Sequence, residues 1–444
     1  MPDQFRFVGR RTNHFQRIAH LLTQVADPDQ IIYELIQNAD DSEADSARFV
    51  FTDNEFRVTN NKAFTTCSDP VDSWDCDFGE EDRLCDFHSI REVQNANKTS
   101  ERDTTGAFGV GFNAVYRVTD SPQLISAGRH WTFQDHDEEE FKRIRECLGD
   151  CAEKCGNRPG TTFILPWATE AGTSGRTTFE VPPVSPEMID DYERSALDSV
   201  PKALLFSRHL EEITVETRAG DRSYSRTEAD ASRVISLPQG KTERWLILEG
   251  EFDDEAESLR MRFPDPFRRS TTKWATVQVA VRENDTDTPV EGFIHATFPT
   301  RQTTYLPIHI NAEVFPDEGR VNLLSTQEKG EWNKAAVAEA GRVLADEVVA
   351  IRDAMDSPFH FWDLICASWV AHKRGVEDDL GLTRYWQTYL HEALLSKEVI
   401  RVESGKWCSP DEVRSRYVEH GDQTTEEEDG LAITVLDRLG VETV

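Results

Sequence analysis

Two segments constrain what this chain can fold into more than any other feature. In residues 34–41, Glu34, Asn38 and Asp41 recur near the helical period, so an acid, an amide and a second acid share one helical face. Residues 106–112 form a glycine-rich turn that leads into an apolar helix predicted at 112–116. Turns of this kind bind phosphates through backbone N–H groups. Together the two segments predict a nucleotide site, although either alone is a weak signal.

The polar helix face carries the chemistry that ATP hydrolysis requires. A carboxylate must orient and deprotonate water, while a metal ion screens the phosphate oxygens. Glu34 is the candidate general base, the amide oxygen of Asn38 is a candidate Mg²⁺ ligand, and Asp41 can hold waters or support the site. The alternative for this helix alone is an ordinary amphipathic helix with polar residues in solvent.

Length and charge narrow the class of protein. A chain of 444 residues exceeds one ordinary core, which predicts two or three domains. The net charge of −33 argues against a nucleic-acid-binding surface, so direct nucleic-acid binding is not expected. A nucleotide pocket in such a field needs local positive charge from Lys98, from loop N–H groups or from magnesium. The sequence has neither a membrane-spanning apolar run nor a signal peptide, so we expect no membrane contact and a cytoplasmic protein.

Six of the eight cysteines fall into two trios, one before the glycine-rich turn and one after it. The trios are Cys67, Cys76 and Cys85, and Cys147, Cys151 and Cys155. One hypothesis is a thiolate metal site that joins both trios, with His88 or His136 as a further ligand. The alternative is reduced, unligated thiols in acidic surface insertions. The spacing lacks the Cys-x-x-Cys pair typical of structural zinc sites.

The order of predicted elements indicates an α+β fold, in which helices cover one face of a mixed sheet. A second α/β domain and a mostly helical C-terminal part follow, and the predicted domains are 1–170, 171–356 and 357–444. Helices are predicted at 15–25, 28–41, 186–200 and 328–354, with Pro201 as a kink or a new start. Strands are predicted at 47–52, 55–59, 123–127, 130–133, 161–166 and 274–281. Residues 135–154 are predicted to be a charged, helix-like insertion.

Residues 34–42 resemble the first conserved box of the GHKL ATPases, the superfamily of gyrase, heat-shock protein 90, histidine kinases and MutL. The sequence of this segment is most similar to the sacsin-type branch, and so is the sequence of residues 106–113. Residues 160–166 resemble the closing strand, and weaker likeness continues at 306–311, 331–333 and 405–410. The resemblance implies a Bergerat-type ATP-binding sandwich in residues 1–170.

Carried over by position, the resemblance makes Glu34 the general base and Asn38 the magnesium ligand, with Asp41 beside them. Lys98 matches a lysine near the phosphates, and Thr161 matches a threonine that reaches the nucleotide near the adenine. The phosphate loop comprises Gly106, Phe108, Gly109, Val110, Gly111 and Phe112. Residues 94–105 are the expected lid.

One departure from the superfamily concerns the base-binding position. The usual adenine-binding aspartate, in an Asp-x-Gly-x-Gly setting, is replaced here by the residues after the strand at 55–59. An asparagine oxygen can still accept a hydrogen bond from the adenine amino group, with less strength because it is uncharged. Asn60 is the expected contact and Asn61 the alternative.

A residue of the second domain often completes such sites at the γ-phosphate. Arg320 resembles that position and Arg301 is a weaker choice, while a surface salt bridge is the alternative for both. The resulting prediction is an ATP-binding, Mg²⁺-dependent ATPase that acts as a chaperone-like conformational machine on an unidentified protein client, and relatives of this type often dimerise. The alternative is a nucleotide-gated interaction module without hydrolysis. A histidine kinase lacks support, because no phosphoacceptor helix precedes residue 28.

Overall fold

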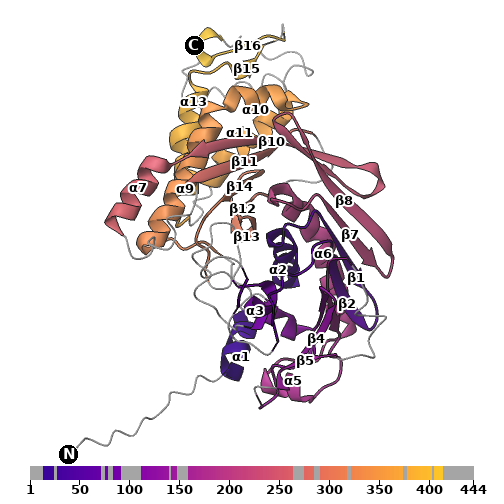
Figure 1. Ribbon diagram of the computed structural model, residues 1–444. Helices are drawn as coiled ribbons and strands as arrows, with labels where there is room; N and C mark the ends of the chain where they lie inside the picture. Colours follow the sequence, from indigo (N-terminus) through magenta and orange to yellow (C-terminus); the bar gives the residue numbers. More distant parts are fainter. Residues whose placement is uncertain are drawn as a thin grey trace, which may run out of the picture. The chain divides into compact units, whose positions relative to one another are not determined.

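The computed structural model divides the chain into two compact units, Met1–Ser225 and Arg226–Val444. Each unit combines a sheet with helices, which confirms the predicted α+β class (Figure 1). The three-domain division stays a prediction. The described residues are 14–24, 28–71, 76–78, 84–91, 112–139, 142–147, 159–263, 275–284, 291–317, 322–373, 378–402 and 405–413.

The first unit is built on a mixed sheet in the order β8-β7-β1-β2-β6-β3-β4-β5. Its strands are β1 (Ser46–Phe51), β2 (Glu55–Asn60), β3 (Gln123–Ser126), β4 (Arg129–Phe133), β5 (Ile144–Glu146), β6 (Thr161–Pro166), β7 (Glu212–Thr217) and β8 (Gly220–Ala229), which begins in this unit and ends beyond Ser225. β1 runs parallel to β7, and the other registered pairs in this unit are antiparallel. The predicted strands before residue 170 are confirmed to within two residues at their ends.

Burial alternates along β1 and β2, so one face of this sheet is packed and the other is partly open. The helices of the unit are α1 (His14–Gln24), α2 (Pro28–Asp41), α3 (Asp86–Arg91), the 3₁₀ segment η2 (Phe112–Arg117), α5 (Ser174–Thr178) and α6 (Pro186–Phe206). Figure 1 shows α2 and α6 together beside β1, β2 and β7. The helix predicted at 112–116 is therefore present, but as a tighter 3₁₀ turn.

The prediction of a helix-like insertion at 135–154 is wrong for the residues that the structure describes there. Residues Ile144–Glu146 form β5, which pairs antiparallel with β4. The Glu146 carboxylate accepts hydrogen bonds from Arg129 at 2.6 Å and from the Trp131 indole at 3.3 Å. The charged pattern that resembled a helix face therefore serves cross-strand pairing at a sheet edge.

Helix α6 begins as predicted, because the Ser185 hydroxyl accepts the Met188 N–H at 3.3 Å. Pro201 was expected to kink or restart the helix, yet α6 continues to Phe206. Proline removes the N–H that would bond the carbonyl four residues earlier. That carbonyl, on Leu197, accepts the Tyr224 hydroxyl at 3.4 Å instead. A partner from the sheet thus compensates for the missing helix bond.

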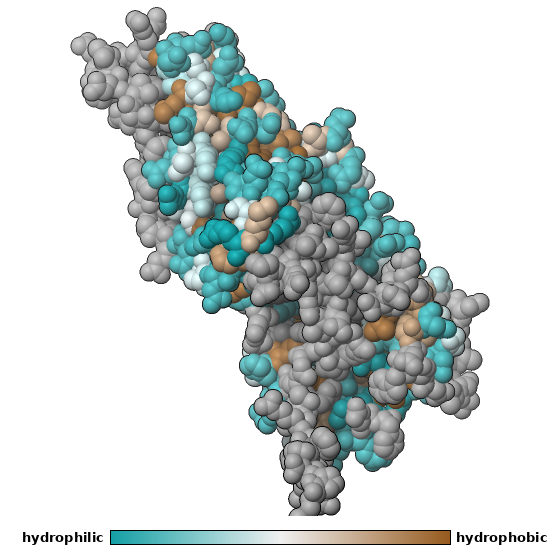
Figure 2. Space-filling view, turned by 60° about the vertical axis from the view of Figure 1, so that its left-hand side comes forward, coloured by the Kyte–Doolittle hydropathy of each residue, from teal (hydrophilic) through white to brown (hydrophobic). Residues whose placement is uncertain are grey.

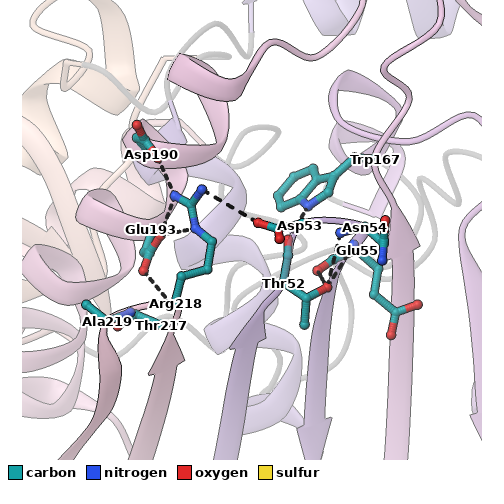
Figure 3. A network of polar contacts seen from close by, with 10 residues as sticks. All are labelled: Thr52, Asp53, Asn54, Glu55, Trp167, Asp190, Glu193, Thr217, Arg218 and Ala219. Carbon is teal, nitrogen blue, oxygen red and sulfur yellow. Dashed lines mark hydrogen bonds and ion pairs between the residues drawn. The ribbon is translucent and has the colours of Figure 1, made fainter.

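Charged contacts hold α6 against the β7–β8 turn (Figure 3). The Arg218 guanidinium donates to Glu193 at 3.0 and 2.8 Å and also to Asp190, both on α6. Asp53, in the β1–β2 turn, lies 4.0 Å from Arg218. These groups are partly solvated, so the network contributes to the position of α6 more than to stability.

The second unit carries a sheet in the order β9-β10-β11-β14-β12-β13. Its strands are β9 (Ser232–Ser236), β10 (Thr242–Glu251), β11 (Thr276–Arg282), β12 (Phe293–Ala296), β13 (Phe298–Thr303) and β14 (Ile308–Ala312). Its helices are α7 (Asp253–Arg262), α9 (Gln327–Asp346), α10 (Val348–Ala354), α11 (Pro358–Lys373), α12 (Leu382–Tyr385), a π-helical turn (Trp386–His391) and α13 (Glu392–Leu394). The long helix predicted at 328–354 is divided at Glu347. The hairpin of β15 (Ile400–Arg401) and β16 (Trp407–Cys408) follows the helical stretch.

The described surface is mostly hydrophilic. Figure 2 shows hydrophilic side chains over most of the described surface in that view, with only small apolar patches among them. The large exposed apolar residues among those described are Met261, Phe359, Val370 and Leu395. Across the described helices, none combines the length and the hydropathy needed to cross a membrane.

Candidate functional site

The predicted catalytic face lies on α2. Glu34, Asn38 and Asp41 are half-buried, whereas Leu35, Ile36 and Ala39 between them are buried. The apolar residues pack α2 into the first unit, and the three polar side chains occupy the stripe that remains partly accessible. Asn38 and Asp41 offer an amide and a carboxylate oxygen, the donor type that Mg²⁺ prefers. The stripe therefore has the chemistry for a metal-assisted site.

Asp40, which the sequence reasoning did not single out, fixes the end of this helix. Its carboxylate is 1% exposed and accepts three backbone N–H groups, from Arg208 at 3.0 Å, His209 at 2.8 Å and Leu210 at 2.9 Å. Charge-assisted bonds of this kind are stronger than neutral ones. Asp40 thus attaches the C-terminal turn of α2 to the loop between α6 and β7.

A polar row crosses the packed face of the sheet near the strand ends. Register places Asn60, Thr161 and Ser126 side by side on β2, β6 and β3, and the small apolar Ala47 of β1 lies beside Asn60. The next row on the same face is apolar and consists of Phe49, Val58, Phe163 and Leu124. Hydrogen-bonding groups thus lie beside an apolar row, and these are the two kinds of contact that a purine base uses.

Asn60 ends β2 and is 7% exposed. Its side-chain oxygen accepts the Lys62 N–H at 2.9 Å, and this oxygen has a second lone pair for another donor. Gly160 packs against the backbone of Asn60, because a Cβ at Gly160 would lie 1.9 Å from the Asn60 carbonyl oxygen. Gly160 also has φ +87°, which strains any other residue. The backbone at Asn60 is therefore closely confined.

Asn61 is placed differently. Its side chain is exposed, and its amide donates to the Asp45 carboxylate at 2.6 Å. Its side-chain oxygen accepts the Ser46 N–H at 3.4 Å. Asn61 thus stabilises the start of β1, away from the polar row that contains Asn60. Of the two alternatives, the geometry favours Asn60 for a base contact.

Thr161 is buried and its hydroxyl is held on two sides. It donates to the Lys62 carbonyl at 2.7 Å and lies 2.8 Å from the Ser126 hydroxyl. Ser126 in turn accepts the Phe64 N–H at 2.8 Å. Thr161 therefore joins β6 to the segment after Asn60. Ser126 is a site residue that sequence reasoning missed, because nothing in its neighbourhood marks it before the register is known.

Phe112, predicted as part of the phosphate loop, belongs to an aromatic core. Its ring lies 5.1 Å from that of Phe133 and 5.5 Å from that of Phe163. Phe112 therefore anchors η2 to the sheet. The other predicted phosphate contacts lie outside the described residues. They are Lys98, the loop residues Gly106, Phe108, Gly109, Val110 and Gly111, and the second-domain residue Arg320. The lid at 94–105 lies outside them too. Arg301, the weaker alternative, is exposed.

A buried arginine holds the far end of η2. Arg176 is 3% exposed, and its Nε donates to Asp120 at 2.7 Å. Its remaining donors reach the carbonyl oxygens of Tyr116, Arg117, Thr119 and Pro182. Burial lowers the pKa of Arg176, and the Asp120 carboxylate opposes that shift. This residue fixes the exit of the segment that follows the glycine-rich turn.

Comparison with known proteins gives one family match and one curated relative. Residues 11–147 match the family model described as the Sacsin domain. Sacsin from Homo sapiens is 25% identical over 245 residues, a match that covers 45% of this chain. It covers 5% of that relative, so this chain corresponds to a small part of its length.

Two solved structures are distant neighbours. The N-terminal domain of a DNA repair protein has a TM-score of 0.39 and 10% identity, and the match covers 82% of this chain and 100% of that one. The ATPase region of Saccharomyces cerevisiae topoisomerase II has a TM-score of 0.32 and 9% identity, with 66% and 76% covered.

Proposed function

We propose that the first unit, whose residues 11–147 match the Sacsin domain, binds ATP with Mg²⁺ and hydrolyses it slowly. Closure of the ATP-bound pocket would drive a chaperone-type conformational change that acts on a protein client. The observation that supports this proposal most is the half-buried stripe of Glu34, Asn38 and Asp41 on α2. None of these three side chains is fully exposed, and together they provide an amide and two carboxylates on one face.

Each polar side chain has a role that its chemistry suits. Glu34 would orient and deprotonate the attacking water. Asn38 would hold Mg²⁺ through its amide oxygen, with Asp41 positioning the surrounding waters. When bound, the ion supplies charge screening at the phosphate oxygens. Asn60 would accept the adenine amino group, while Thr161 and Ser126 keep the strand ends in register around it.

The strong negative charge of the chain makes magnesium essential to this proposal. At −33, the protein repels a free triphosphate, whereas the magnesium complex carries less negative charge. Lys98 and the N–H groups of the glycine-rich turn remain the predicted local donors. We therefore expect ATP without a divalent cation to bind much more weakly than the complex.

The proposal is tested by calorimetry on the full chain with ATP, with and without Mg²⁺. We expect binding that needs the cation, and a rise in melting temperature equivalent to about 2.7 kcal/mol at a hundredfold excess over Kd. Asn38→Ala should weaken binding of the magnesium complex at least about tenfold, since it removes a metal ligand. Asn54→Ala, on the exposed β1–β2 turn, is the matched control. If the unmodified chain showed neither binding heat nor a change in melting temperature with ATP and Mg²⁺, the proposed function would be refuted.

A second variant pair tests the base contact. Asn60→Ala should weaken ATP affinity about tenfold, the effect of one hydrogen bond to a partly buried partner. Asn61→Ala should leave affinity unchanged, because that side chain bonds Asp45 at the start of β1. Affinities for ATP and GTP measured side by side would show whether base selectivity falls with Asn60. Equal affinity of both variants for ATP would reject the assignment.

Arg320 remains the proposed γ-phosphate contact, and its substitution belongs in the same turnover assay. A protein client and a homodimer remain proposals that follow from the family resemblance. A cytoplasmic location remains an expectation from the sequence. The second candidate function is a nucleotide-gated interaction module. It shares the binding residues and differs only in the absence of turnover.

A further inference from the structure

Three cysteines and one histidine come together in the segment between β2 and the predicted lid. The Nδ1 atom of His88 lies 3.4 Å from the sulfur of Cys67 and 3.2 Å from that of Cys85. The sulfur of Cys76 accepts the Cys85 N–H at 3.2 Å. One ligand atom from each of these four residues lies within 4.8 Å of the other three. None of the three thiols forms a disulfide.

From this geometry we propose that Cys67, Cys76, Cys85 and His88 form a structural zinc site. Three thiolates and one imidazole are a ligand set of structural zinc sites, which are tetrahedral and closed. With Zn–S near 2.3 Å, the sulfurs of such a site lie about 3.8 Å apart. The four ligand atoms are thus already within about 1 Å of the required spacing. Soft thiolates also select zinc over the magnesium expected on α2.

The surrounding hydrogen bonds hold the three contributing segments in place. The Asp86 carboxylate accepts both the N–H and the hydroxyl of Thr65 at 2.8 Å. Asp77 accepts the Ser68 N–H at 2.9 Å, and Arg91 donates to the Pro70 carbonyl at 2.8 Å. These bonds join residues 65–70 to residue 77 and to α3. The ligands are therefore pre-positioned by contacts that do not involve them.

Burial supports a structural role. Cys85 and His88 are 0% and 3% exposed, while Cys67 and Cys76 are half-buried. All four positions of a tetrahedral ion are filled by protein atoms, which leaves none for a substrate or water. Phe87, between two of the ligands, packs against Phe64 and Trp131 at 5.4 and 4.8 Å. The ion would thus fasten α3 to the segment that follows Asn60.

The earlier hypothesis of one site joining both cysteine trios is wrong. Cys147 is disulfide-bonded, so it is neither a thiolate ligand nor a reduced thiol. Cys151 and Cys155 lie outside the described residues. His136 packs edge-on against the Phe179 ring at 6.4 Å and does not belong to the cluster. Of the candidate ligands predicted from the sequence, Cys85 and His88 are confirmed as neighbours, and their Cys-x-x-His spacing is that of a short zinc-binding pair.

Metal content of the untagged, full-length protein tests the proposal. We expect about one zinc ion per chain by mass spectrometry of the metal. Cys67→Ser and Cys76→Ser each remove a half-buried ligand and should reduce that content at least about fivefold. Cys366→Ser, a half-buried cysteine of the second unit, should retain it. Full zinc content in both ligand variants would overturn the proposal.

Chelation provides a readout that does not depend on variants folding. Treating the unmodified protein with a strong zinc chelator should lower its melting temperature, and Zn²⁺ should restore it while Mg²⁺ does not. Cobalt in place of zinc should give the intense thiolate charge-transfer absorption of a sulfur-rich tetrahedral site. Absence of bound zinc together with an unchanged melting curve after chelation and zinc addition would overturn the proposal. ATP affinity is measured separately, so failure here leaves the proposed nucleotide site untouched.

Discussion

Replacing Glu34 with glutamine should lower the rate of ATP hydrolysis by about 10²- to 10⁴-fold, the usual contribution of a general base. Glutamine has nearly the same shape but cannot take the proton from water. Because Glu34 is only half-buried on α2, we expect the substitution to leave the packing of the helix unchanged. Affinity for the magnesium complex should therefore change by less than about threefold, because the lost interaction belongs to the chemical step.

The measurement is single-turnover hydrolysis beside a binding titration on the same preparation. Glu170→Gln, an exposed glutamate of the first unit, is the control and should match the unmodified protein. Equal turnover by Glu34→Gln would exclude Glu34 as the base. Tight binding without turnover in the unmodified protein would instead favour the nucleotide-gated module, because the binding residues would be present and the chemistry absent.

Local pattern was enough to locate the elements that carry the site. The helix predicted at 28–41 coincides with α2, since Pro28 suits a first turn and the apolar spacing is helical. The strand predicted at 161–166 coincides with β6, whose residues are buried from Thr161 to Leu165. Alternation and helical period are local properties, so one sequence contains them. The break at Glu347 inside the predicted long helix shows the limit, because both halves have helical composition.

Contacts between distant residues could not be predicted in this way. Asp40 lies beside Asp41 in the sequence, and the two have identical side chains. One of them accepts three N–H groups from residues 208–210, and the other lies on the half-buried stripe. Only the packing of α2 against α6 separates the two roles. The same holds for Ser126, whose partners Phe64 and Thr161 are set by sheet register.

The largest loss of stability should follow from Arg176→Met. Methionine fills much of the volume but leaves the Asp120 carboxylate and several carbonyl oxygens without their donor. Removing one partner of a buried charge pair costs about 3–5 kcal/mol. In urea unfolding of the full chain, the free energy of unfolding of the transition that involves the first unit should fall by that amount. Hydrogen exchange should speed up in η2, since the carbonyl oxygens of Tyr116 and Arg117 lose the guanidinium that donates to them.

Two further variants separate the buried charge from a general effect of losing an arginine. Arg194→Met removes an exposed ion pair with Asp191 on α6 and should cost less than about 1 kcal/mol. Adding Asp120→Asn to Arg176→Met should restore part of the loss, because it removes the carboxylate that has become uncompensated. A shift no larger than that of Arg194→Met would contradict the role of Arg176. If instead only hydrogen exchange in η2 rises when Arg176 is replaced, the residue holds the end of η2 without stabilising the whole unit.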